Sequence, residues 1–469
     1  MTHHDPGEKD SEGPISAVLT RRRVLAEAVR SRLWPMPTAA VLLAVLAGIG
    51  LPELDAVLDD HLPTEVARYL FGGGADAARE VLGAIAGSLI TVTSLTFSLT
   101  LVTLQLASSQ YSPRLLRTFA ADRVVQRTLA LFLSTFIYAL TVLRTVRNDT
   151  VDAPASGFVP QIAVTTAYLL TVASVVALVL FLGHLVRQIR VESLLEQVRA
   201  DTCATAARVL PLSSASADTT GVPVPEPPPH IVEATSSGFL VEIDHRALLA
   251  AAMQADAQVW VDRPIGSPVL AGTPVAFCWP SQPNAAWDNE VVETLQGQVH
   301  QALRTGSERT AAQDVGYGLR QLTDVVVRAL SPGINDPTTA VHGLVACTAV
   351  LADLLQRQLG PYSLRDKENR IRVVVARPSF PDLLDLVCTQ PRLYGTDDPV
   401  VLAAILSMLR DLAWTTTTAE QRTAISDQLG LLREHFADHG PTARRRLEYA
   451  ARQVSEALER RWTPRNSGS

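Results

Sequence analysis

The chain has 469 residues, enough for two or three domains, and 47% of them are hydrophobic. The formal net charge of −6 argues against a basic surface, so we expect no nucleic-acid partner. The four cysteines stand far apart and form no CxxC pair, which argues against a zinc site or a disulfide framework.

Four apolar stretches are long enough to cross a bilayer. Residues 1–32 form a polar N-terminal segment without the early apolar run of a cleavable signal peptide. The stretches follow over about 33–51, 81–107, 128–143 and 160–186. Since about 20 apolar residues cross ~30 Å of hydrocarbon, we predict a multi-pass α-helical membrane protein with four transmembrane helices in a domain over 33–190.

The positions of the arginines predict the orientation of these helices. Arginines are concentrated before the first stretch, between the second and third, and after the fourth, whereas the loop after the first stretch is mainly acidic. Because positively charged loops stay on the cytoplasmic side, we expect both termini in the cytoplasm.

The second stretch is unusually polar for a transmembrane helix. Val81–Pro113 has no charged residue but carries eleven serines and threonines and two glutamines. At helical spacing the polar positions fall on two adjoining faces. The first face contains Gly87, Thr91, Ser94, Ser98, Gln105 and Ser109. The second face contains Thr93, Thr96, Thr100 and Thr103.

Two interpretations of these faces remain open. Small and hydroxyl side chains let helices approach closely and hydrogen-bond across the contact, so the faces can serve packing alone. Alternatively, the hydroxyls and amides line a pore and replace part of an ion's hydration shell. Two polar faces exceed what one helix contact requires. Four helices are too few to enclose a path, so the pore interpretation requires a homo-oligomer.

Two interpretations also remain open for the end of this stretch, LQLASSQYSPR at 104–114. Pro113 disfavours a helical conformation at the residue before it. The polar residues of this predicted cytoplasmic exit are Gln110, Tyr111, Arg114 and Arg117. The arginines either extend from a helix end into the interface or form an electropositive vestibule that favours anions. His184, near the end of the fourth stretch, is interpreted as an interfacial residue rather than a proton relay.

The remainder of the chain predicts a cytoplasmic α+β module. Residues 191–229 combine an amphipathic helix with a Pro-rich linker. Short β-forming runs separated by Gly and Pro predict a small β-barrel or sandwich over 230–282. Residues 283–469 are predicted to be mainly helical. His245 lies inside the β-rich region, where a surface turn is favoured over a catalytic role.

The sequence SPGINDP at 331–337 separates two predicted helices. Asp336 is expected as the N-cap and Pro337 as the first residue of the second helix. A capped turn explains this pattern, and the other interpretation is a ligand loop with Asn335, Asp336 and His342. No nucleophile elbow, HExxH, Walker loop or CxxC pair occurs in the chain. We therefore expect no enzyme activity, no cofactor and no bound metal.

Several motifs together resemble the DUF2254 family of predicted bacterial integral membrane proteins. They include FGGGAD at 71–76, SLITVT at 88–93, LQLASSQYSPRLL at 104–116 and ALSPGINDP at 329–337. The resemblance implies a protein of the bacterial cytoplasmic (inner) membrane, and it supplies neither an activity nor catalytic residues. The resemblance also implies a Gly-Asp pair at a position where this chain has Gly266-Ser267. We therefore expect that any role of the aspartate in the family is not kept in this chain.

Two functional hypotheses follow. The first is an oligomeric ion channel or channel-like transporter, with the second stretch lining the path and the cytoplasmic module gating it. The alternative is a membrane-anchored scaffold or sensor whose cytoplasmic module binds a protein or a small ligand. The lipid bilayer and further copies of the chain are the expected partners.

Overall fold

The computed structural model describes residues 34–58, 70–110, 122–147, 158–188, 190–213, 230–282 and 287–463. The chain divides into two compact units, Met1–Arg190 and Val191–Ser469. We call them the membrane unit and the α+β unit and describe each separately.

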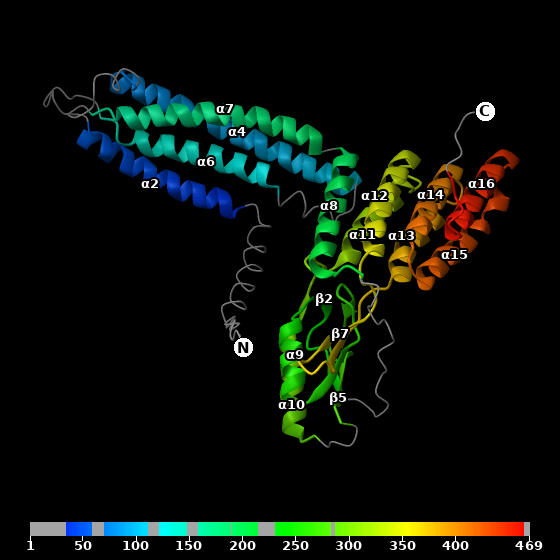
Figure 1. Cartoon of the computed structure of the whole chain (residues 1–469). Coiled ribbons are helices and arrows are strands. Elements are labelled where there is room, and N and C mark those ends of the chain that lie inside the picture. The colour runs from blue at the N-terminus through cyan, green and yellow to red at the C-terminus, as the bar shows by residue number, and fades with distance from the viewer. Residues whose placement is uncertain are drawn as a thin grey trace, which may run out of the picture. The chain divides into compact units, whose positions relative to one another are not determined.

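Four long helices form the described part of the membrane unit (Figure 1): α2 (Pro35–Leu58), α4 (Ala75–Gln110), α6 (Arg123–Leu143) and α7 (Gln161–Gln188). Each is long and apolar enough to cross a membrane, as predicted. The central helix is α6, which packs against the other three. The shared core contains Leu82, Phe132 and Tyr138, all buried.

A fifth helix, α12 (Pro337–Leu355), meets the same criteria of length and hydropathy, whereas four such helices were expected. It lies in the α+β unit and packs against several neighbouring helices there. Half of its most apolar window is buried inside the protein, and helices of this apolar character occur both in protein cores and in membranes. The direction in which the chain crosses the membrane stays a prediction.

Polar contacts join the helices of the membrane unit at the end where α7 begins. The Asp55 carboxylate, near the end of α2, accepts hydrogen bonds from the N–H groups of Ile162 and Ala163 at 3.0 and 2.9 Å. Arg79 of α4 donates to the Val146 carbonyl, which follows α6, at 3.0 Å. These contacts satisfy backbone groups that a helix end leaves free.

Helices make up most of the α+β unit. They are α8 (Val191–Val209), α11 (Val315–Ala329), α12, α13 (Phe380–Tyr394), α14 (Pro399–Thr415), α15 (Ala419–Arg433), a 3-10 turn (Phe436–Asp438) and α16 (Pro441–Leu458). Helix α8 packs on α11 and α12. The contact with α11 requires glycine at position 318, since a Cβ there would lie 1.9 Å from the Thr202 hydroxyl oxygen.

The strands of this unit form two open sheets. The first has the order β1 (His230–Glu233), β5 (Pro274–Pro280), β3 (Ala257–Val261), β8 (Ile371–Val375) and β7 (Tyr362–Arg365). The second has the order β4 (Pro268–Val269), β2 (Gly238–Ile243) and β6 (Leu303–Gly306). Helices α9 (His245–Gln254) and α10 (Asn289–Ala302) share one hydrophobic core with both sheets.

The predicted small barrel over 230–282 is therefore wrong. Its strands divide between the two sheets, and each sheet recruits strands from later in the chain. Strand β3 pairs in parallel with β8, and β2 pairs antiparallel with β6. These long-range pairings occupy the strand edges that closure of a local barrel would require.

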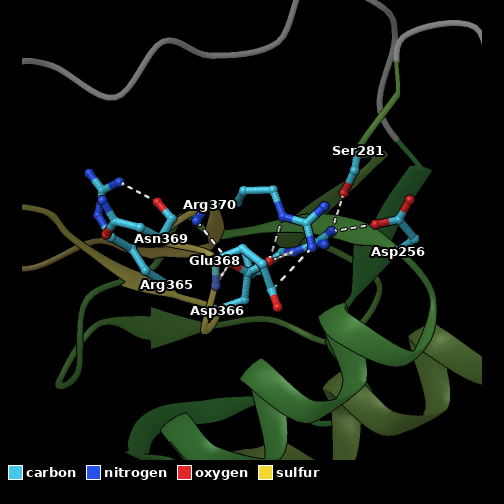
Figure 2. Close-up of polar contacts among 8 residues, drawn as sticks. Asp256, Ser281, Arg365, Asp366, Glu368, Asn369 and Arg370 are labelled. Carbon is cyan, nitrogen blue, oxygen red and sulfur yellow. Dashed lines mark hydrogen bonds and ion pairs between the residues drawn. The ribbon is translucent and has the colours of Figure 1, made fainter.

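An ion-pair network lies where the parallel strands β3 and β8 begin (Figure 2). Arg372 Nε contacts Asp366 Oδ2 at 2.8 Å, and its Nη1 contacts Asp256 Oδ1 at 2.6 Å and also donates to Ser281. Arg370 Nε contacts the same Asp366 oxygen at 2.8 Å. The side chains of Arg372 and Asp366 are 5% and 0% exposed. Each buried charge has opposite charges beside it, so the network ties the sheet together.

Candidate functional site

Helix α4 carries most of the predicted site residues. It begins after Gly74, whose carbonyl accepts a hydrogen bond of 3.0 Å from the N–H of Ala78. Asp76 in the first turn places a negative charge at the positive end of the helix dipole. The sequence from there to Gln110 has no proline, so α4 continues as one helix of 36 residues.

One polar face of α4 is buried against the other helices of the unit. Thr93, Thr96, Thr100 and Thr103 are all buried. Three of these hydroxyls donate to the carbonyl four residues earlier at 2.6 to 2.9 Å, which satisfies them within the helix. The Thr96 hydroxyl has no hydrogen-bond partner among the described residues. This face packs inside the unit.

The other polar face is exposed on the outside of the membrane unit. Its described members are Gly83, Gly87, Thr91, Ser94, Ser98 and Gln105, and we call them the outer stripe. At 100° per residue they fall within about 80° of the helix circumference. Leu101, which is 51% exposed, lies at the edge of the same arc, in line with Gly83, and is its large apolar residue. A Cβ added at either glycine would meet no atom within 4 Å. Gly83 was not predicted as a member of this face. Its spacing of four residues from Gly87 is nevertheless a sequence signal of close contact between helices.

Large apolar side chains flank the outer stripe on both sides. Ile90 and Phe97 lie on one side and Leu95 and Val102 on the other, and all four are 44% to 58% exposed. The exposed surfaces of the neighbouring helices differ from this pattern. Between Ala39 and Ile49 of α2, and between Leu169 and Leu182 of α7, every exposed residue is a leucine, isoleucine, valine or alanine.

Such apolar surfaces suit contact with lipid. The outer stripe is a narrow polar band in the middle of an otherwise lipid-compatible surface, and a polar band of this kind favours contact with protein or water over contact with hydrocarbon. The arrangement explains how one helix carries both a packing face and a second polar face.

Comparisons with known proteins bear on the whole chain. Residues 30–411 match a family described as predicted membrane protein (DUF2254). The chain belongs to the DUF2254 family. Uncharacterized protein Mb1321c of Mycobacterium bovis and uncharacterized protein Rv1290c of Mycobacterium tuberculosis are each 33% identical to it over an alignment of 458 residues. The alignment covers 95% of this chain and 84% of each relative. No solved structure matches the chain significantly.

The motif LQLASSQYSPRLL at 104–116, which includes Gln105 of the outer stripe, is only partly described. Ser109 and Gln110 lie in the last turn of α4, and their side chains lie outside the described residues. Tyr111, Arg114 and Arg117 lie outside them entirely. The vestibule and the interfacial arginines therefore both stay predictions.

Residues 331–337, within the motif ALSPGINDP, form a capped turn between α11 and α12. Asn335 adopts a φ of 48°, and Asp336 accepts bonds from the backbone N–H and the hydroxyl of Thr339 at 3.1 and 2.6 Å. The bonds from Thr339 lower the pKa of Asp336. His342 is exposed, with its Nδ1 3.9 Å from a carboxylate oxygen of Glu192. The local role of Asp336 is helix capping, and a ligand role for this loop stays a prediction.

His184 has a partner that the sequence did not indicate. Its Nε2 lies 2.6 Å from Asp122 Oδ2, and the other oxygen of Asp122 accepts from the N–H of Val124 at 2.7 Å. Asp122 therefore caps α6 and contacts α7 at the same time. This pair joins two helices of the DUF2254 membrane unit at the end opposite Asp55.

Proposed function

We propose that copies of this membrane protein assemble through the exposed side of α4 and that the outer stripe lines a channel-like path at the centre of the assembly. The α+β unit acts as the gating module. The observation that carries the proposal is the polar stripe at the surface of a unit whose other helices expose apolar residues. The family assignment supports the membrane location and assigns no permeant.

The order of residues along α4 gives the proposed assembly two zones. At Gly83 and Gly87 the absence of a side chain lets neighbouring copies approach closely. Farther along, hydroxyls and an amide face the axis, where they can replace water around a permeating ion. The flanking residues, such as Ile90 and Leu95, then contact adjacent copies through apolar surface.

Packing between copies without a path is the competing role of the stripe. Both roles bury the stripe in an oligomer, but only the path requires that small polar side chains stay accessible to ions. The two roles therefore differ in the effect of added bulk at Ser94 and Ser98, because leucine there fills a narrow path.

The test reconstitutes the full-length protein in liposomes and measures ion flux together with oligomer mass. We expect wild type to form one oligomer and to conduct. The variant Ser94→Leu/Ser98→Leu is expected to keep the oligomer mass and lose flux. The matched control is Val175→Leu/Val179→Leu, which adds bulk to exposed positions of α7 and is expected to preserve both properties.

Each result decides between the roles. A monomeric Ser94→Leu/Ser98→Leu variant assigns the stripe to packing between copies. Unchanged oligomer mass and unchanged flux in that variant show that the outer stripe neither packs between copies nor lines a path. Absence of flux from folded wild-type oligomers, across several ions and pH values, refutes the channel.

The alternative, a membrane-anchored scaffold or sensor, is favoured by one observation. The α+β unit is compact by itself and has its own hydrophobic core, so a recognition role does not depend on a path through the membrane. Stable oligomers or monomers without flux, combined with ligand binding by full-length protein, support this alternative.

A further inference from the structure

Three polar side chains converge where the parallel strands β3 and β8 end. Val261 and Val375, the last residues of these strands, pair with each other, and Val375 also pairs with Tyr362 of β7. Arg377 follows two residues after β8, and His245 is the first residue of α9, which runs back along β3. Ligands in α/β proteins commonly bind beyond the carboxyl ends of parallel strands.

The three side chains contact one another. The guanidinium carbon of Arg377 lies 3.8 Å from the centre of the Tyr362 ring, and the Tyr362 hydroxyl is hydrogen-bonded to His245 Nε2. The two rings meet nearly at right angles, with centres 5.6 Å apart. Arg377 Nη1 donates to the Gln358 carbonyl at 3.2 Å. Stacking on an aromatic ring and one backbone bond hold the guanidinium in a defined orientation.

The charge of Arg377 is not balanced within the described part of the chain. The side chain is partly buried, and no carboxylate of a described residue forms an ion pair with it. Arg372, five residues earlier and within β8, has two carboxylates beside it. Burial lowers the pKa of Arg377, and the pKa of His245 is lowered by burial and by the nearby Arg377. A partly buried cation without a counter-charge is costly unless an anion binds.

Asp244 is the nearest acid to His245 in sequence, and its oxygen is already engaged. Its Oδ1 accepts from the N–H groups of Arg246 and Ala247 at 3.1 and 3.0 Å. It is the N-cap of α9. The carboxylate therefore satisfies the start of the helix, while the guanidinium of Arg377 keeps N–H groups without a described partner.

We propose that Arg377, Tyr362 and His245 form a binding site for an oxyanion, the phosphate or carboxylate group of a small molecule or a lipid headgroup. Arg377 supplies the charge and planar N–H donors that match an oxyanion. Tyr362 orients the guanidinium by stacking, and the hydroxyl–imidazole pair supplies a further donor. The site does not depend on the assembly proposed for α4.

The test is calorimetric titration of the full-length protein in detergent with three probes: inorganic phosphate, acetate and short-chain phosphatidic acid. We expect Arg377→Gln to weaken binding by about tenfold or more, the loss of one charge-assisted contact. The control is Arg365→Gln, an exposed arginine of β7 whose guanidinium bonds to the Asn369 carbonyl. It removes the same charge from β7, the strand that begins with Tyr362, and is expected to leave affinity within about twofold.

A second measurement separates binding from a structural role. Without a probe, Arg377→Gln is expected to unfold at the same temperature as wild type or higher, because the substitution removes an unpaired charge. Phosphate is expected to raise the unfolding temperature of wild type only. The probe that binds most tightly shows whether the site prefers a phosphate or a carboxylate group, and whether it prefers a lipid headgroup to the free anion. Absence of binding by all three probes, equal binding to wild type and Arg377→Gln, or destabilisation of Arg377→Gln without any probe effect on wild type would overturn the proposal.

Discussion

The carboxylate of Asp55 accepts a hydrogen bond of 2.9 Å from the backbone N–H of Ala163, which lies 108 residues later in the chain. Its other oxygen accepts from the N–H of Ile162 at 3.0 Å. A side chain near the end of α2 thus caps the start of α7, and its negative charge faces the positive end of that helix. Asp55 is only 4% exposed, so the cap also fixes the position of α2.

Replacing Asp55 tests this long-range cap. We expect Asp55→Ala to lower the free energy of unfolding by about 2 kcal/mol, because it leaves two helix N–H groups without acceptors. Thermal unfolding in detergent, followed by circular dichroism, measures the change. Glu53 is exposed on the same helix, and Glu53→Ala is expected to stay within about 0.5 kcal/mol of wild type. Equal losses in the two variants contradict the cap.

Gly266 is expected to tolerate no side chain. Its φ is 88°, and a Cβ would lie 2.1 Å from Asp314 Oδ2. Asp314 cannot easily move, since Arg309 binds both of its oxygens at 2.8 and 3.0 Å. We expect Gly266→Ala to cost about 2–4 kcal/mol, from backbone strain and displacement of this ion pair.

Gly272 provides the matched control for Gly266. Its φ of 78° is similar, but a Cβ there would meet no atom within 4 Å. Gly272→Ala should therefore show only the backbone cost of about 1 kcal/mol. Comparison of the unfolding temperatures of Gly266→Ala and Gly272→Ala measures the effect of the contact between a Cβ at position 266 and Asp314. Equal losses of stability in the two variants would show that this contact has no energetic role.

Asp366 is expected to make the stability of the α+β unit depend on pH on the acid side. Burial by itself raises the pKa of Asp366. The hydrogen bonds from Arg372 and Arg370 together have the larger effect and lower the pKa to about 2. The pKa of an unfolded-chain aspartate is about 3.9. Because the folded value is the lower one, the carboxylate stabilises the fold above about pH 4, and this contribution is lost as the pH falls toward 2.

The variant Asp366→Asn removes this contribution. We expect its unfolding temperature to lie below that of wild type by a constant amount above about pH 5, and the difference to shrink below about pH 4. Glu368→Gln, which removes an exposed carboxylate near Arg370, is expected to leave the acid profile unchanged. A difference that grows on acidification refutes this role for Asp366.

A buried glycine of α2 and two exposed glycines of α4 are expected to respond differently to a larger side chain. A Cβ at Gly48 of α2 would lie 2.8 Å from Thr141 Cβ of α6, whereas Gly83 and Gly87 of α4 face open space. Gly48→Leu should lower stability by about 1–3 kcal/mol through overpacking. Gly83→Leu/Gly87→Leu should leave the fold stable and reduce the oligomer mass, which light scattering in detergent measures. Loss of folding in the α4 variant would contradict the exposed position of this face.

Helix positions and caps were largely predictable because they depend on nearby residues. Each of the four predicted stretches is a helix, although α4 begins at Ala75 rather than near Val81 and includes the charged residues Arg79 and Glu80. The cap at Asp336 was also predicted, since Asp followed by Pro is a local signal for a helix start. The sheets were not predictable in the same way, because β3 pairs with a strand that begins only at Ile371.

The sequence by itself determined that this is a multi-pass membrane protein of the DUF2254 family and that α4 has two polar faces. Hydropathy, helical spacing and motifs carry that information within short segments. Only the tertiary structure decided which face is covered, because both are rich in hydroxyls and differ only in what packs against them. The same holds for the meeting of His245 with Tyr362, 117 residues apart: such contacts depend on strand pairing and core packing, which no local pattern specifies.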